Sequence, residues 1–222
     1  MAHKTIVIDL NRCVNCTACN TACKTVNDVE IGNYWNKVIR VNITPQDQSA
    51  WPEGVQWYYL PLQCQHCTNA PCVDVCPTGA SHVAEDGTVQ IEADACIGCQ
   101  SCIPVCPYGV RYYNAAKVIV EKCNMCRDLT DAGKLPQCVS QCVGLAKWYG
   151  DIDDDPTMLS FKGGDDQTLG EACMDFSDDE VHTLPDAGNG PSIRYILRGK
   201  EWRDDVDFTL TQGGHGFGLP NY

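Results

Sequence analysis

Seventeen cysteines in 222 residues are the chain's main means of doing chemistry, and sixteen of them fall into four closely spaced groups, which we call tetrads one to four. Tetrads one and three have the spacing C-x2-C-x2-C-x3-C, tetrad two C-x2-C-x4-C-x3-C and tetrad four C-x2-C-x11-C-x3-C. The first of these spacings is typical of ligands to a 4Fe-4S cluster. In chain order the tetrads are Cys13, Cys16, Cys19, Cys23; Cys64, Cys67, Cys72, Cys76; Cys96, Cys99, Cys102, Cys106; and Cys123, Cys126, Cys138, Cys142.

The spacing also predicts how the tetrads share their clusters. Three thiolates on one tight loop reach three corners of a cube, and in two-cluster units the fourth cysteine ligates the other cluster. Backbone N–H groups of such a loop can point inward and offset the negative charge. We expect the fourth cysteine to open a short helix toward the second cluster. Crossing the tetrads predicts set 1 (Cys13, Cys16, Cys19, Cys142), set 2 (Cys64, Cys67, Cys72, Cys106), set 3 (Cys96, Cys99, Cys102, Cys76) and set 4 (Cys123, Cys126, Cys138, Cys23).

Other uses of cysteine fit the pattern less well. Cysteines this close in sequence rarely reach disulfide geometry. Structural zinc usually binds two separated C-x2-C pairs, a pattern that tetrad four alone resembles. Redox-active C-x2-C thiols do not explain a fourfold repeat. Iron–sulfur ligation is therefore favoured, and a zinc-stabilised interaction module stays open as an alternative that predicts zinc and a colourless protein.

The elements that must position these thiols predict an α+β fold of two nested bacterial-ferredoxin-like units, with short strands and helices around the clusters. Tetrads two and three are near copies, since Cys76-Pro77-Thr78-Gly79 matches Cys106-Pro107-Tyr108-Gly109. Between them, residues 81–84 and 88–92 predict a hairpin with its tight turn at Asp86-Gly87. Residues 5–10, 38–43, 55–62 and 118–120 predict further strands, the middle two as a pair.

Three regions follow from this pattern. Residues 63–116 form the central two-cluster unit, and residues 1–62 plus 117–150 form the outer one. Residues 151–222 are expected to be an irregular acidic C-terminal extension that docks a partner, or simply a solvated surface.

Charge and hydropathy limit the partners. The formal net charge is −13, and residues 151–222 carry 16 acidic and 5 basic side chains. This balance argues against nucleic-acid binding, which needs a basic surface. No run approaches the roughly 18–20 apolar residues of a membrane span. Residues 1–10 show neither a cleavable apolar stretch nor a twin arginine. We therefore expect a cytoplasmic protein, or one exported folded with a partner that carries the signal.

The tetrads and several short phrases resemble the iron–sulfur electron-transfer subunit of the molybdopterin oxidoreductases, the family of dimethyl-sulfoxide, polysulfide and thiosulfate reductases. The resemblance is strong over residues 1–150 and weaker over 185–197. It implies a non-catalytic subunit with four 4Fe-4S clusters and with molybdenum or tungsten pterin only in a large catalytic partner, which set 1 would face. The phrases are Cys64-Gln65-His66-Cys67, Ala70-Pro71-Cys72, Cys96-Ile97-Gly98-Cys99 and Gly190-Pro191-Ser192-Ile193-Arg194-Tyr195-Ile196.

Further partners expected from the resemblance are a membrane-anchor or cytochrome subunit, or a soluble electron donor. An independent polyferredoxin that carries electrons for another enzyme is the alternative. Outside the tetrads we find no nucleophile, acid–base or nucleotide-binding motif, so no catalytic residue is predicted. We expect His66 to support a cluster from behind its ligands, Lys122 and Arg127 to be solvated, and Cys173 to be a free thiol.

Overall fold

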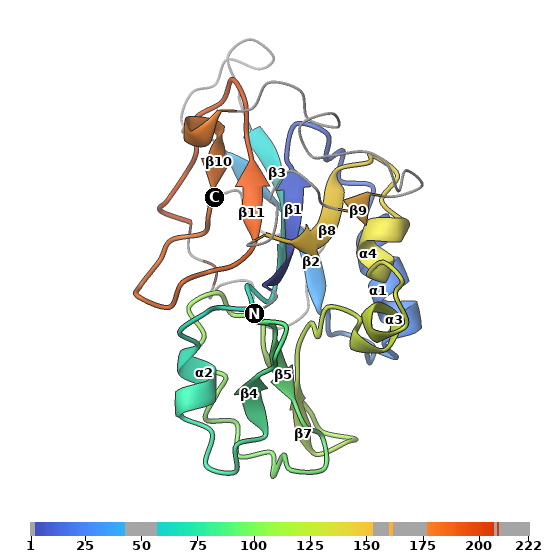
Figure 1. The fold of residues 1–222 in the computed structure, drawn as a ribbon, viewed down its shortest axis with the longest axis vertical. Helices are drawn as coiled ribbons and strands as arrows, with labels where there is room; N and C mark the ends of the chain where they lie inside the picture. The colour runs from blue at the N-terminus through green and yellow to red at the C-terminus, as the bar shows by residue number, and fades with distance from the viewer. Residues whose placement is uncertain (1–2, 43–56, 153–159, 162–176, 207, 209–222) are drawn as a thin grey trace.

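A five-stranded sheet lies at one end of the molecule. The structure is a computed structural model that describes residues 3–42, 57–152, 160–161, 177–206 and 208 (Figure 1). The strands lie in the order β10-β11-β1-β8-β9. The central strand β1 pairs antiparallel with β8 and parallel with β11, so residues from both ends of the described chain meet in one sheet. The strands are β1 (Lys4–Asp9), β8 (Lys147–Asp151), β9 (Ser160–Phe161), β10 (Val181–His182) and β11 (Arg194–Ile196).

Three two-stranded antiparallel hairpins complete the β structure. The strands expected near residues 5–10, 38–43, 55–62, 81–84, 88–92 and 118–120 are confirmed within the described residues. Gly87 adopts φ 77° in the turn of the second hairpin, where the Asp-Gly pair predicted it. The hairpins are β2 (Asn36–Asn42) with β3 (Trp57–Gln63), β4 (Ser81–Val83) with β5 (Val89–Ile91), and β6 (Tyr112–Asn114) with β7 (Ile119–Glu121).

A short helix carries the third cysteine of tetrads one, two and four, which corrects the expectation that the fourth cysteine opens a helix. Cys19 and Cys23 both lie inside α1, and Cys142 follows the end of α4. Residues four apart lie on the same face of a helix, about one turn from each other along its axis, so α1 places Cys19 and Cys23 one turn apart. The helices are α1 (Ala18–Val26), α2 (Pro71–Asp74), α3 (Arg127–Asp131), α4 (Gln137–Ser140) and the 3-10 turn η1 (Asp178–Glu180).

The mixture of short helices and small sheets agrees with a ferredoxin-like α+β protein. In Figure 1, α2 and the hairpins of β4, β5 and β7 lie at the end opposite the large sheet, and α1, α3 and α4 group beside that sheet. Among the residues described, no helix has both the length and the apolar character that crossing a bilayer requires. The division into nested units stays a prediction.

The region after residue 150 is not an irregular surface extension where the structure describes it. Residues 177–206 supply β10 and β11, and Leu184, Ile193 and Tyr195 are fully buried. Tyr195 Oη donates to the carbonyl of Pro61 (3.2 Å) and accepts from Gln65 Nε2 (3.1 Å). The expectation failed because scattered buried residues in a Gly- and Pro-rich context give no local pattern, and the burial of Tyr195 depends on the pairing of β11 with β1.

Truncating Tyr195 tests this core contribution. Tyr195→Ala removes a fully buried ring and both of its hydrogen bonds, so we expect unfolding to become easier by about 3–5 kcal/mol. Urea titration followed by circular dichroism measures the change. Ile31→Ala is the control, since Ile31 is 99% exposed and its loss should stay within about 0.5 kcal/mol. Equal effects in the two variants would refute the core assignment.

Candidate functional site

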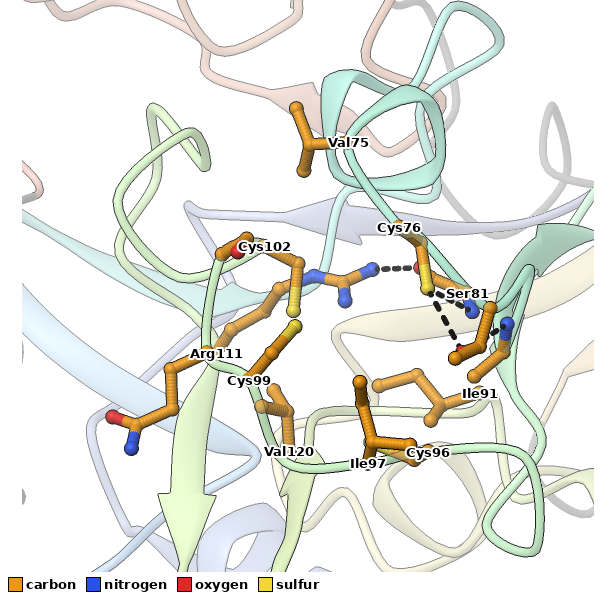
Figure 2. A pocket seen from close by; sticks show the side chains of 14 residues that line it. Val75, Cys76, Ser81, Ile91, Cys96, Ile97, Cys99, Cys102, Arg111 and Val120 are labelled. Carbon is orange, nitrogen blue, oxygen red and sulfur yellow. Dashed lines mark hydrogen bonds between the residues drawn. The ribbon is translucent and has the colours of Figure 1, made fainter.

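The thiols of set 3 line one cavity of about 340 Å³, part of which is open to solvent. Cys76 enters from the segment after α2, and the other three come from the loop that precedes β6 (Figure 2). This cavity therefore brings Cys76 of tetrad two beside three cysteines of tetrad three, and the crossed ligation itself stays a prediction. Apolar side chains complete the wall: Val75, Ile91, Ile97 and Val120.

Sets 1 and 4 each line a cavity of their own. Cys142 joins the first three cysteines of tetrad one around a cavity of about 350 Å³, part of which is open to solvent. Cys23 joins the first three cysteines of tetrad four around a cavity of about 270 Å³, which is likewise partly open. Helix α1 lies between these two places, because it carries Cys19 to the set 1 cavity and Cys23 to the set 4 cavity.

The thiols of set 2 are buried and close enough to influence one another. Burial, followed by the charges of Cys64 and the other two thiols of the set, raises the pKa of Cys67 to about 12. Two long-range donors reach this set. Arg111 Nη2 donates to Cys72 Sγ (2.8 Å), and Asn189 Nδ2 donates to Cys67 Sγ (3.1 Å). Asn189 lies 122 residues from Cys67, so the C-terminal segment takes part in the site.

A backbone feature recurs in the first C-x2-C pair of each of the four tetrads. The residue just before the second cysteine has a positive φ, whether or not it is glycine: 54° at Asn15, 44° at His66, 65° at Gly98 and 60° at Met125. A left-handed residue among right-handed ones turns successive N–H groups toward one concave side, which suits an anion. Positive φ at non-glycine residues is strained and concentrates at functional sites. Spacing alone did not reveal this feature.

Backbone and side-chain donors point at the sulfur atoms. The N–H of Ser81 donates to Cys76 Sγ (3.3 Å), and the N–H of Ala146 donates to Cys142 Sγ (3.2 Å). Each of these sulfurs belongs to the fourth cysteine of its tetrad. Such hydrogen bonds stabilise a thiolate over a thiol and are a recognised means of adjusting an iron–sulfur centre.

Unpaired buried amides give a direct test of whether the residues fit a cluster. Asn36 Nδ2 and Gln63 Nε2 are buried, have no hydrogen-bond partner among the described residues and line the set 4 cavity. A buried donor without an acceptor is costly. The inorganic sulfides of a cluster accept hydrogen bonds. Four thiolates and two unpaired N–H donors therefore fit a 4Fe-4S cluster in this cavity.

Three cations are buried among the sets. Lys147, Lys122 and Arg111 are only 1%, 3% and 3% exposed. Burial lowers the pKa of Lys147, but the thiolates around it outweigh burial and raise the pKa above its usual value. The expectation that Lys122 is solvated is therefore wrong, whereas Arg127 lies at the surface in ion pairs with Asp86 and Asp131.

His66 and Cys173 complete the predicted residues. His66 is fully buried, and its Nδ1 accepts the N–H of Val89 (3.1 Å), so a neutral ring carries its proton on Nε2. Burial acts to raise the pKa of Cys64, but His66 and the nearby cations outweigh it and lower that pKa to about 5. Cys173 lies outside the described residues. Sequence reasoning missed Arg111, Lys147 and Asn189, which carry no local signal.

Comparison with known proteins places the chain among iron–sulfur proteins. Residues 55–152 match the 4Fe-4S dicluster domain family. The chain is 33% identical to a Halobacterium salinarum protein named as a dimethyl sulfoxide reductase iron–sulfur subunit, over 91% of this chain and 84% of that protein. It is 42% identical to the thiosulfate reductase electron transfer subunit of Salmonella typhi, over 66% and 74% of the two chains. It is 38% identical to one of the polypeptides of polysulfide reductase from Wolinella succinogenes, over 70% and 80%.

Gly98→Ala tests the close backbone approach at set 3. A Cβ at Gly98 would lie 2.5 Å from the carbonyl oxygen of Val118, in addition to the strain of its positive φ. We expect loss of the set 3 iron, about four atoms of about sixteen, measured by elemental analysis of the anaerobically purified protein. Gly79→Ala is the matched control, since it has φ +69° but nothing within 4 Å of the new Cβ, and it should keep its iron. Equal losses would show that backbone strain, and not the contact, decides the outcome.

Proposed function

Because the chain belongs to the family of iron–sulfur electron-transfer subunits of the molybdopterin oxidoreductases, we propose that it relays single electrons through four 4Fe-4S clusters to or from a large molybdopterin-containing catalytic subunit. It is itself a non-catalytic subunit. The observation that supports four clusters is the grouping of sixteen thiols into four sets of four, three of which line cavities. When bound by four thiolates, a 4Fe-4S cluster supplies a one-electron couple whose potential depends on hydrogen bonds, charge and exposure.

The chain's own residues would hold these clusters and adjust them. Each set supplies the four thiolates of one cluster. Backbone N–H groups, together with the amides of Asn27 and Asn189, donate to the sulfurs. The buried amides of Asn36 and Gln63 are available to the cluster of set 4. No proton-transfer group is required, because the proposed function moves electrons alone.

The contacts between neighbouring sets support the order 1–4–2–3. Helix α1 connects sets 1 and 4 through Cys19 and Cys23. Sets 4 and 2 adjoin at Cys123 and Cys64. Burial raises the pKa of Cys123, and the charge of the nearby Cys64 raises it further. Arg111 donates a hydrogen bond to Cys72 of set 2 and lines the cavity of set 3. In this order sets 1 and 3 are the two ends of the relay.

Both proposed ends carry an exposed cysteine with apolar neighbours. At set 1, Cys16 is exposed, and Val14 and Val143 are 63% and 65% exposed. At set 3, Cys99 is exposed and Ile97 is 63% exposed. Exposed apolar side chains around a redox centre suit a protein interface that excludes water. We propose that set 1 faces the catalytic subunit and set 3 faces a membrane-anchor or cytochrome subunit, or a soluble donor.

Elemental analysis of the protein isolated anaerobically with whatever co-purifies tests the function. We expect about 16 iron atoms per chain, and molybdenum or tungsten in a co-purifying large subunit. Iron without either metal would support an independent polyferredoxin instead. Zinc in place of iron would overturn the electron-transfer proposal.

Replacing Cys142 tests the crossed ligation. Cys142→Ser should disrupt the cluster held with tetrad one and leave the other three, so about a quarter of the iron or of the cluster's spectroscopic signal is lost. Electron paramagnetic resonance of the reduced protein distinguishes the clusters. Ser140→Ala, two residues away in α4, is the control and should keep all four signals. Loss of the cluster held by Cys123, Cys126 and Cys138 instead would refute the crossing.

A charge placed at set 1 tests the docking surface. Val14→Asp should weaken binding of the catalytic subunit at least tenfold, because a carboxylate would be desolvated in the interface. Quantitative co-purification or calorimetry with the isolated partner measures the effect. Ile31→Asp is the control, since Ile31 is equally apolar and 99% exposed but does not line the set 1 cavity. Unchanged binding by the Val14 variant would remove set 1 from the interface.

A further inference from the structure

The three buried cations are distributed regularly along the proposed relay. Lys147, Lys122 and Arg111 are each almost fully buried, and each adjoins two consecutive sets in the order 1–4–2–3. Burying a cation is costly unless nearby groups compensate it. Their positions relative to the thiols therefore call for a physical explanation.

Lys147 lies at the junction of sets 1 and 4. Its side chain lines the set 1 cavity, beside Cys19 and Cys142. Its Nζ donates to Gln63 Oε1 (3.1 Å), and Gln63 lines the set 4 cavity with its unpaired Nε2. One ammonium group thus contacts the wall of the first cavity and, through a single amide, the wall of the second.

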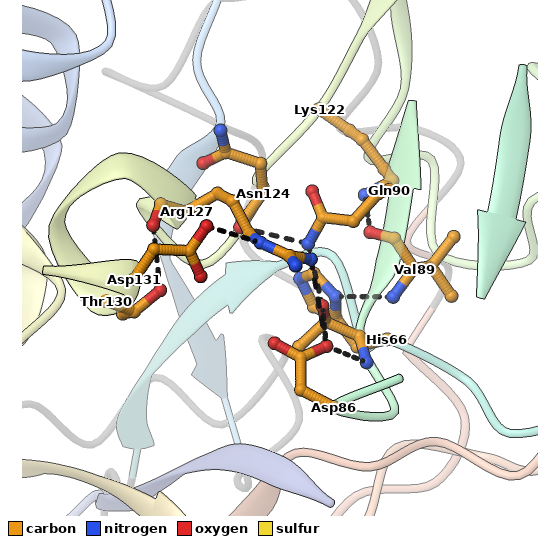
Figure 3. A network of polar contacts seen from close by, with 10 residues as sticks. His66, Asp86, Val89, Gln90, Lys122, Asn124, Arg127, Thr130 and Asp131 are labelled. Atoms are coloured by element: carbon orange, nitrogen blue, oxygen red, sulfur yellow. Dashed lines mark hydrogen bonds and ion pairs between the residues drawn. The ribbon is translucent and has the colours of Figure 1, made fainter. Parts of the chain in front are cut away.

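Lys122 lies at the junction of sets 4 and 2. Its Nζ donates to the carbonyl oxygens of Cys123 (2.9 Å) and Val89. Cys123 belongs to set 4. The N–H of the same Val89 donates to His66 Nδ1, and His66 lies between the first two cysteines of set 2 (Figure 3). The ammonium group therefore connects both sets through short hydrogen-bonded paths.

Arg111 lies at the junction of sets 2 and 3. Its Nη2 donates to Cys72 Sγ of set 2 (2.8 Å) and to Ser81 Oγ (2.9 Å). The N–H of Ser81 donates to Cys76 Sγ of set 3 (3.3 Å). Figure 2 shows the guanidinium group at the wall of the set 3 cavity, beside Cys102.

Resting on the proposed function, we propose that Lys147, Lys122 and Arg111 form a row of fixed positive charges, one at each junction, each raising the reduction potentials of the two clusters it separates. Reduction adds one negative charge to a cluster, and a buried cation nearby stabilises that charge strongly because water does not screen it. A shared cation acts on two clusters at once. The row would thereby keep the potentials of consecutive clusters close together.

Potentiometric titration of the full, cluster-loaded chain, followed by electron paramagnetic resonance, tests this assignment. Lys147→Gln should lower the potentials of the clusters of sets 1 and 4, Lys122→Gln those of sets 4 and 2, and Arg111→Gln those of sets 2 and 3. At the wild-type midpoint, the ratio of reduced to oxidised cluster should fall about tenfold, which is about 59 mV for one electron. The two clusters not touched by each variant should keep their potentials.

Two kinds of control separate charge from packing. Lys37→Gln removes another buried lysine, which is 6% exposed but does not line any of the three cysteine cavities, and it should shift no cluster. The charge-retaining variants Lys147→Arg, Lys122→Arg and Arg111→Lys should keep wild-type potentials. If one Gln variant loses iron, the cluster potentials of the other two Gln variants test the proposal. If all three lose iron, wild-type iron and potentials in the charge-retaining variants support the proposal.

The opposing results are distinct. Unchanged potentials in iron-replete Gln variants, a uniform shift of all four clusters, or equal shifts in the charge-retaining variants would overturn the row of charges while leaving the electron relay intact. A wild-type chain without iron would instead refute the proposed function.

Discussion

The concentration of thiolates in a small volume is the constraint on which the rest of the structure depends. Burial, with smaller contributions from neighbouring thiolates, raises the pKa of Cys13 to about 11 and that of Cys138 to about 11. Metal ligation requires these groups to lose their protons, so the protein must supply positive charge and hydrogen-bond donors to the same places. The backbone N–H groups, the buried amides and the three buried cations all supply positive charge or hydrogen-bond donors near the thiolates. The backbone N–H of Asn15 and the charge of Lys147 oppose the effect of burial on the pKa of Cys13, and Lys147 opposes it at Cys138.

This requirement explains why the chain brings distant segments together. A loop of cysteines can offer its own N–H groups, but it cannot supply a buried cation at a chosen depth. Lys147 lies on β8, and Asn189 lies in the segment that leads into β11. Pairing of β1 with both strands fixes these side chains relative to Cys13, which lies in the loop after β1. The five-stranded sheet is therefore part of the site and not a separate support for it.

Local patterns predicted the parts of the molecule that local physics determines. The hairpin with Gly87 follows from turn chemistry and is confirmed, whereas the assignment of the cysteine sets to clusters follows from ligand spacing and stays a prediction. The left-handed backbone at Met125 could not be predicted, because a methionine gives no preference for positive φ and the loop around it imposes the conformation. Burial of Lys122 was also missed, since a lysine beside a cysteine is usually solvated. The burial of Tyr195 depends on a strand partner nearly two hundred residues away, which periodicity cannot reveal.

The position of the buried cations has a physical logic of its own. At the two ends of the row of sets, Cys16 and Cys99 are exposed, so water or a partner protein can stabilise added negative charge there. At the junctions no comparable solvent is available, and an added electron would meet the neighbouring set's charge in a weakly screening interior. A fixed cation at each junction stabilises added negative charge, as solvent does at the two ends. Such a device also involves little rearrangement when the charge changes, because the ammonium and guanidinium groups are already held by backbone carbonyls, amides and sulfur. In the relay that we propose, this arrangement would favour electron movement in either direction along the row, and the partners at the two ends would determine the direction that is used.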